Sequence, residues 1–175
     1  CSRKAELTGE TVFAGNVTTE KEKAVLKTDQ SELAALLYDL PKTSGAFAVR
    51  AELEYSSEQE FGIALHTDEG MEQGYFLRIR PSQHLMAWDM WPRGEQGRYQ
   101  WQLIDIPYQI ETSRYIPKAE KYELLLIKEG DICVVYLNGK TALSTRLYDH
   151  KGGKAGIYIT QDEIKIQKLE FLTAE

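Results

Sequence analysis

The sequence has few cysteines, no strongly basic run and no long apolar run. Only two cysteines occur in 175 residues, Cys1 and Cys133, which excludes a zinc-finger arrangement. The longest apolar clusters, such as ELLLI and ICVVYL, have strand length and fall well short of the roughly 18 residues of a membrane-spanning helix. The formal net charge is -6. This charge argues against nucleic acid and anionic membranes as main partners, since both require a concentrated basic patch.

The motifs of common enzyme classes are also missing. The chain has no Gly-rich phosphate loop, no His/Cys cluster with metal-ligand spacing and no nucleophile elbow, so we expect no cofactor and no metal. One catalytic option stays open, because a sandwich can host a glycosidase with paired carboxylates. Glu52 and Glu54 in RAELEY share a strand face. At this spacing they are neighbours rather than groups across a cleft, so we expect no catalysis from this chain alone.

Length and composition indicate one globular domain. Hydrophobic residues make up 42% and charged residues 27% of the chain, which is typical of a protein with its own core. Residues 1–30 are polar and contain Gly9 and Gly15, so we interpret them as an N-terminal segment or linker with one or two short strands. Residues 31–175 then form the single domain. Residues 29–40 fit a helix or a strand, and their second half favours a strand.

Apolar and polar residues alternate with a period of two from residue 47 onward. The first such segments are 47–55, 61–67 and 74–80. Others follow at 84–91, 99–106, 122–129, 131–139, 154–160 and 164–172. Turn signals such as PRGEQG, EGD and NGK separate them. Many short strands with turns every 8 to 12 residues predict an all-β, antiparallel two-sheet β-sandwich.

One hairpin, residues 74–91, carries an unusual set of side chains. If PSQ forms its turn, residue 78 pairs with 86 and residue 76 with 88. Tyr75, Leu77, Ile79, Leu85 and Ala87 then face the core. The opposite face carries Phe76, Arg78, Arg80, His84, Met86, Trp88 and Met90.

The outer face of this hairpin predicts a sugar site. Aromatic rings stack on sugar faces, and charged side chains bind hydroxyls. We expect Trp88 to stack on the sugar and Arg78 to donate hydrogen bonds to it. Glu52 and Asp89 would accept hydrogen bonds and His66 would orient the ligand, although strict alternation puts Asp89 on the core side unless the strand bulges. The alternative is an ordinary solvent face with an Arg78–Glu52 ion pair.

The C-terminal third resembles a known family. ICVVYLNGKTALSTRLYDHKGGKAGIYIT followed by IKIQKLEFL resembles the C-terminal β-sandwich of family 32 glycoside hydrolases (levanases, invertases and fructosidases). It is also similar to the related family 66 fructan-binding module. The resemblance rests on the Asn138-Gly139 turn, the strand at 142–148, the Gly152-Gly153 turn and the strand at 156–159. FGIALHTDEGMEQGYFLRIRP adds a strand pair similar to that of concanavalin A-like sandwiches, so the resemblance spans residues 36–172.

This resemblance implies a concanavalin A-like jelly roll without catalytic residues, because the family's W-M-N-D-P-N-G, R-D-P and E-C motifs are absent. The implied function is a bacterial carbohydrate-binding or accessory module of a fructan- or sucrose-cleaving glycoside hydrolase. Its ligand would be a terminal sugar such as fructose, its partner an upstream catalytic domain in the same polypeptide, and its location extracellular or at the cell surface. The STR match adds Arg146 to the ligand-binding residues.

Two alternatives to sugar binding stay open. The sandwich could be purely structural and pack on a catalytic propeller, which an exposed apolar patch with Met86, Met90 or Trp91 would favour. It could also be a stand-alone concanavalin A-like glycosidase that uses Glu52 and Glu54. Cys1 is open to two interpretations as well, as the acylated first residue of a bacterial lipoprotein or as the point where a fragment was cut.

Overall fold

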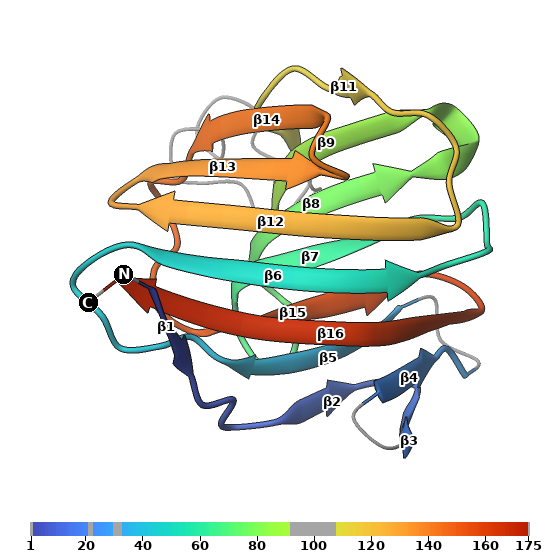
Figure 1. Cartoon of the computed structure of the whole chain (residues 1–175), viewed down its shortest axis with the longest axis horizontal. Coiled ribbons are helices and arrows are strands. Elements are labelled where there is room, and N and C mark those ends of the chain that lie inside the picture. Colours follow the sequence, from blue (N-terminus) through green and yellow to red (C-terminus); the bar gives the residue numbers. More distant parts are fainter. Residues whose placement is uncertain (1, 21–22, 30–32, 92–107, 175) are drawn as a thin grey trace.

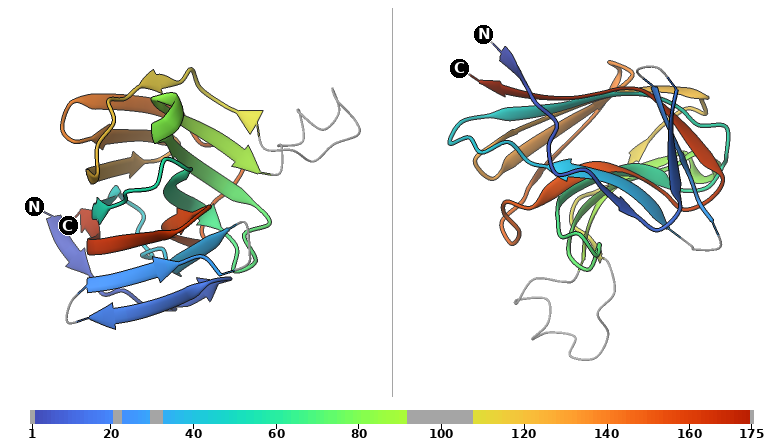
Figure 2. Two further views of the ribbon diagram at one scale, coloured as in Figure 1. Left: turned by 90° about the vertical axis from the view of Figure 1, so that its right-hand side faces the viewer. Right: turned by 90° about the horizontal axis from the view of Figure 1, so that it is seen from below.

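The structure is a computed structural model that describes residues 2–20, 23–29, 33–91 and 108–174. Its strands form two antiparallel sheets of eight strands each, which lie against each other as two layers (Figure 1; Figure 2, right). The prediction of an all-β two-sheet sandwich is therefore confirmed. Within the described ranges, no helix is long and apolar enough to cross a membrane.

Sheet A contains most of the C-terminal strands. Its order is β14 (Thr141–Arg146), β13 (Ile132–Leu137), β12 (Lys121–Glu129), β6 (Phe47–Glu54), β16 (Glu163–Ala174), β4 (Lys23–Lys27) and β3 (Asn16–Glu20). Strand β1 (Ser2–Ala5) also pairs with β16.

Sheet B contains the hairpin discussed above. Its order is β10 (Tyr108–Gln109), β9 (Leu85–Trp91), β8 (Gly74–Arg80), β7 (Phe61–Thr67), β15 (Lys154–Ile159), β5 (Ala34–Asp39) and β2 (Thr11–Phe13). Strand β11 (Arg114–Tyr115) also pairs with β9. The second half of the ambiguous segment 29–40 is thus a strand, β5.

The N-terminal segment takes part in both sheets. Strand β1 pairs with β16, β2 with β5, and β4 with β16. The Asp39 N–H also donates to the Thr8 carbonyl over 2.9 Å. Residues 2–27, which we interpreted as a segment or linker outside the domain, therefore contribute four strands to the sandwich.

The core lies between the sheets because alternate residues of each strand point inward. On β6, Val49, Ala51 and Leu53 are buried, and on β12 Leu124 and Leu126 are buried. Cys133 on β13 is fully buried as well, and burial raises the pKa of its thiol to about 12.

The register of the β8–β9 hairpin differs by one residue from the predicted one. Arg78 pairs with Ala87, and Leu77 pairs with Trp88. The connection has four residues rather than three, because a 3-10 turn at Pro81–Gln83 is followed by His84 in the left-handed region, with φ 51°. A shift of one residue exchanges the two faces of a strand.

This shift corrects the prediction for Trp88. Its side chain is 0% exposed and lies in the core with Met86 and Met90. The Trp88 ring is therefore not available to stack on a sugar. Asp89, which strict alternation assigned to the core side, lies on the outer face beside Arg78.

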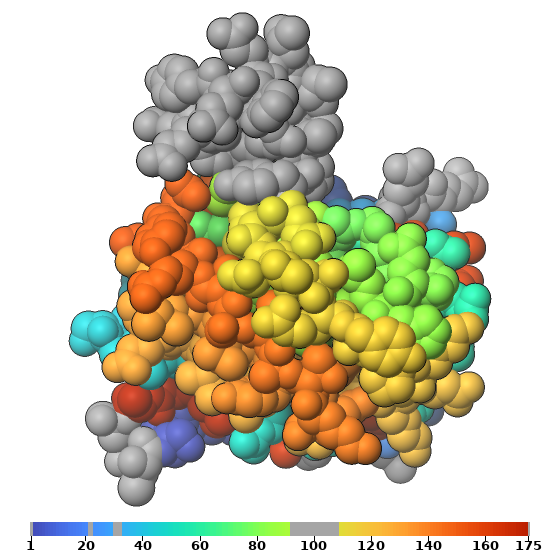
Figure 3. Space-filling view, turned by 90° about the horizontal axis from the view of Figure 1, so that it is seen from above, coloured from blue at the N-terminus to red at the C-terminus, as the bar shows by residue number. Residues whose placement is uncertain are grey.

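The segment from β10 to β12 lies along one edge of the sandwich (Figure 3). Strand β11 pairs with β9, and the Ile116 N–H donates to the His84 carbonyl over 3.0 Å. Strand β11 also lies close to β14, so the segment bridges the β9 edge of sheet B and the β14 edge of sheet A. The strand predicted at 99–106 lies outside the described residues.

Candidate functional site

Five polar side chains meet on the outer face of sheet B, and we call them the Arg78 cluster: Glu60, Arg78, Arg80, Asp89 and Tyr158. Arg78 Nε donates to Glu60 Oε1 over 2.7 Å, and Arg78 Nη1 donates to Asp89 Oδ2. Arg80 Nε donates to the same Glu60 oxygen over 2.7 Å. Tyr158 OH donates to Glu60 Oε2 over 3.2 Å. Glu60 and Asp89 thus hold the Arg78 guanidinium in one orientation, and Arg80 and Tyr158 in turn hold the Glu60 carboxylate.

Small residues flank Arg78 in the sheet. Its partner on β7 is Gly62 and its partner on β9 is Ala87. A Cβ at Gly62 would lie 1.7 Å from the Leu77 carbonyl oxygen, so the close approach of these strands requires glycine. Gly62 and Ala87 are themselves buried, and the Tyr158 ring packs over Gly62, with its Cε1 atom 3.3 Å from the position of the added Cβ.

Burial sets the electrostatics of the Arg78 cluster. It raises the pKa of Asp89, and the neighbouring Arg78 charge opposes but does not cancel this effect. Burial by itself would lower the pKa of Arg78, but the carboxylates of Glu60 and Asp89 raise it. The cluster contains two guanidinium groups and two carboxylates, so its formal charges balance. A balanced set of donors and acceptors suits a neutral, hydroxyl-rich ligand better than a phosphate or a sulfate.

Two of the predicted site residues, Arg78 and Asp89, are brought together here, and Glu52 is not. Glu52 lies on β6 in sheet A, opposite Glu123 of β12 and Lys168 of β16. The chain crosses from one sheet to the other between β6 and β7, and nothing in the local alternation reveals this. The predicted shared face of Glu52 and Arg78, and the alternative ion pair between them, are therefore both wrong.

Arg146 is also separate from the Arg78 cluster. It lies at the end of β14, opposite Ile132 in sheet A. It borders a hollow of about 570 Å³ between the sheet edges, together with Tyr75, Gln109 and Asp149.

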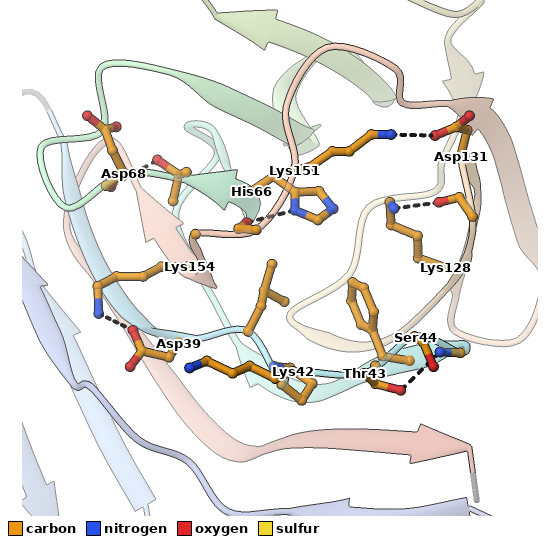
Figure 4. A pocket seen from close by; sticks show the side chains of 18 of the residues that line it. Asp39, Lys42, Thr43, Ser44, His66, Asp68, Lys128, Asp131, Lys151 and Lys154 are labelled. Carbon is orange, nitrogen blue, oxygen red and sulfur yellow. Dashed lines mark hydrogen bonds and ion pairs between the residues drawn. The ribbon is translucent and has the colours of Figure 1, made fainter.

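His66 lies near the end of β7, away from both the Arg78 cluster and the hollow beside Arg146. The larger cavity there has a volume of about 800 Å³ and lies among the loops that follow β5, β7, β12 and β14 (Figure 4). The imidazole Nδ1 is 2.8 Å from the Gly152 carbonyl oxygen. Burial lowers the pKa of His66 to about 4, so its ring is neutral at physiological pH.

The sequence reasoning missed Glu60 and Tyr158. Glu60 ends the turn signal SSEQE, where a carboxylate is expected in solvent, and it joins the Arg78 cluster only because β7 lies beside β8. Tyr158 alternates with Ile157 and Ile159, and all three are buried. The one local signal for Tyr158 in the sequence was the presence of a tyrosine in KAGIYIT. A tyrosine on an outer sheet face can join a polar network through its hydroxyl.

The apolar patch expected for a purely structural domain is not formed by Met86 and Met90, which are buried. The large exposed apolar side chains near the middle of a sheet are Ile127, Ile132 and Tyr136 on β12 and β13. Within the described residues, no group of three or more His, Cys, Asp or Glu side chains could hold a metal ion.

Comparisons with known proteins give a consistent picture. The profile of the family described as "Glycosyl hydrolases family 32 C terminal" matches residues 9–173. No curated protein matches the sequence. Among solved structures, the chain is similar to the carbohydrate binding module CBM66 from Bacillus subtilis, with a TM-score of 0.72, 13% identity, and coverage of 95% of this chain and 97% of that one.

Two further solved structures share the fold. The fructosyltransferase from A. japonicus matches with a TM-score of 0.54 and 18% identity, over 94% of this chain and 26% of the enzyme. The galectin LEC-6 from Caenorhabditis elegans matches with a TM-score of 0.56 and 14% identity, over 86% of this chain and 96% of the galectin.

Proposed function

The chain belongs to the family of C-terminal domains of family 32 glycosyl hydrolases, and from this premise we propose that it is a non-catalytic carbohydrate-binding module. It binds a terminal sugar on the outer face of sheet B, at the Arg78 cluster. The host is a glycoside hydrolase that cleaves fructans or sucrose, and its catalytic domain is the partner in the same polypeptide. The similarity to CBM66 over nearly the whole of both chains supports a binding role rather than a catalytic one.

The observation that carries this proposal is the half-buried, charge-balanced network around Arg78. The Asp89 side chain is 2% exposed, whereas Arg78 and Glu60 are 20% and 18% exposed. Asp89 therefore positions Arg78 from below, and Arg78 and Glu60 reach the solvent. Even paired charges carry a desolvation cost when they are buried, so this arrangement on an outer sheet face favours a ligand site over a purely structural one.

The network binds a sugar by supplying fixed donors and acceptors. The guanidinium has five N–H groups, and Glu60 and Asp89 together occupy two of them. The remaining N–H groups donate to adjacent sugar hydroxyls, while the outer lone pairs of Glu60 accept from them. Because the network is preorganised, little side-chain entropy is lost when the sugar binds.

The experiment is calorimetric titration of the domain with fructose, levan and inulin, with Arg78→Met alongside the unchanged protein. We expect saturable heat with at least one of the three ligands and a loss of affinity of about tenfold or more in the variant, since hydrogen bonds to charged groups contribute about 1.5–3 kcal/mol each.

A matched control is Arg50→Met. Arg50 lies on the outer face of sheet A, opposite Leu125 and Glu170, so the same chemical change is made on the other side of the molecule. Its affinity should equal that of the unchanged protein. An equal loss in both variants, or no heat with any of the three ligands from a folded domain, contradicts the proposal.

A second function is favoured by Ile127, Ile132 and Tyr136, which leave apolar surface on sheet A. On this account the sandwich packs on the catalytic domain and binds no sugar. Ile127→Ser with Tyr136→Ser in the intact host enzyme would then lower the melting temperature of the catalytic domain. The same pair of changes would leave the isolated sandwich nearly as stable as before, because both positions are exposed.

A further inference from the structure

We propose that the cavity around His66 is a second ligand site, separate from the Arg78 cluster, and that it takes a neutral sugar or another polyol. The cavity opens where the space between the two sheets reaches one end of the sandwich (Figure 4). Its volume of about 800 Å³ falls in the range of small-molecule sites, about 300–1,000 Å³.

His66 supplies an unpartnered acceptor. The residue is 6% exposed, and its Nε2 atom is buried with no hydrogen-bond partner within the described part of the chain. The Gly152 carbonyl near Nδ1 can only accept a hydrogen bond, so the proton of the neutral ring lies on Nδ1. Nε2 therefore carries a lone pair and requires a donor, which a ligand hydroxyl provides.

An irregularity of β7 aims this ring into the cavity. His66 has φ 53°, and the pairing of β7 with β15 shifts at this point, between Lys154 and Ala155. A bulge of this kind turns a side chain out of strict alternation. The imidazole consequently meets Phe47 from sheet A at 6.2 Å and Tyr75 from sheet B at 6.4 Å, both edge to face.

Donors and an apolar surface lie next to this acceptor. Lys128 is 8% exposed, and its Nζ donates to the Gly130 carbonyl over 2.6 Å. An ammonium has three N–H groups, so Lys128 retains donors for a ligand. The same Nζ lies 5.9 Å from the centre of the Phe47 ring. An acceptor, a donor and an aromatic side chain within one cavity are the combination that binds a sugar ring.

The charges of the cavity favour a neutral ligand over an anion. Four lysines line it, and so do four carboxylates. Lys154 Nζ is 2.6 Å from Asp39 Oδ1 and Lys151 Nζ is 3.8 Å from Asp131 Oδ1. A neutral imidazole also presents its lone pair to the ligand, which repels an anion and accepts from a hydroxyl.

The test is titration of the whole domain with fructose and, separately, with glucose, followed by long-range ¹H–¹⁵N spectra of the histidine rings. We expect the Nε2 resonance of His66 to shift saturably with at least one of the two sugars. In His66→Asn, the affinity reported by the backbone amides of Gly152 and Gly153 should fall about tenfold. Asparagine tolerates a positive φ, so this variant keeps the backbone geometry.

The chain offers a closely matched control in His84. It too has a positive φ, 51°, and its Nδ1 is 3.0 Å from a backbone carbonyl, that of Ile116, but it lies outside the cavity. His84→Asn should leave the affinity unchanged. Lys128→Met, which keeps the length of the apolar stem, provides a second cavity variant if His66→Asn fails to fold, and it too should lose affinity about tenfold.

Arg78→Met separates the two sites. If the His66 resonance still shifts saturably in this variant, the cavity binds the sugar independently of the Arg78 cluster. This conclusion holds whether or not the Arg78 cluster itself binds a sugar. The proposal is overturned if neither sugar shifts the resonance, if the shift grows linearly without saturation, or if Arg78→Met abolishes it.

Discussion

The two outer faces of the sandwich hold their charged residues differently. On sheet A, Glu170 is 3.3 Å from Lys4 and 3.8 Å from Lys168; Glu170 is only 15% exposed, but the two lysine side chains are 66% and 39% exposed. On sheet B, Arg78 lies between Glu60 and the almost fully buried Asp89. Exposed pairs contribute little to stability, whereas buried networks fix side-chain geometry at a cost. This difference supports the ligand site proposed above on sheet B.

The largest expected effect tests whether the Trp88 side chain lies in the core, beneath the outer face of sheet B. Trp88→Ala should lower the free energy of unfolding by about 3–5 kcal/mol, because it leaves a cavity in the core. Urea denaturation measures this. A Trp88 variant that stays as stable as the unchanged protein and loses only sugar affinity would contradict the inward placement of the ring.

Acidification should lower the stability of the protein because of the buried imidazole of His66 at the end of sheet B. The folded-state pKa of His66, about 4, lies below the unfolded value of about 6.5. The unfolded chain therefore takes up the proton first, and stability falls as the pH drops from about 6.5 to 4. Burial is the main cause, and the charges of Lys128, His150 and Lys151 add to it.

The contribution of His66 amounts to about 3 kcal/mol at most, and it should be absent in His66→Asn. Parallel denaturation series between pH 4 and 7 isolate it as the difference between the two proteins. Identical pH dependence in both would show that His66 does not titrate differently in the folded state.

A matched pair of smaller changes contrasts the two faces directly. Asp89→Asn and Glu52→Gln both replace a carboxylate with an amide, on sheet B and sheet A. We expect Asp89→Asn to lower the free energy of unfolding by about 1–2 kcal/mol, because a hydrogen bond to the Arg78 charge is weakened. Glu52→Gln should stay within about 0.5 kcal/mol, since Glu52 is exposed and faces Glu123 as well as Lys168. Equal effects would remove the distinction between the faces.

The smallest effect is expected at the ion pairs of sheet A. Glu170→Gln should lower the free energy of unfolding by less than about 1 kcal/mol, because its partners Lys4 and Lys168 are exposed, and this loss should shrink at high salt, where the charges of the exposed lysines are screened. Thermal melts at low and high ionic strength provide the measurement. A loss that persists at high salt would mean that sheet A holds its charges as firmly as sheet B does.

The fold class and most of the strands followed from the sequence. The period-two alternation in segments such as 47–55 and 61–67 is a local property, and it identified β6 and β7 with the correct inward residues, such as Val49, Leu53 and Ile63. The same alternation put Arg78 on an outer face. The resemblance over residues 36–172 pointed to the family to which the chain belongs.

The tertiary structure decided which outer residues meet. Which strands pair, and in which register, depends on contacts between residues far apart in the sequence and on the conformation of single turn residues. Alternation of apolar and polar residues does not encode either. The crossing between β6 and β7 separates Glu52 from Arg78. The left-handed conformation of His84 shifts the register of β9 by one residue. As a result Asp89, and not Trp88 as predicted, lies on the outer face. The packing of β7 beside β8 brings Glu60 to Arg78, and the bulge at His66 directs that ring into the end cavity.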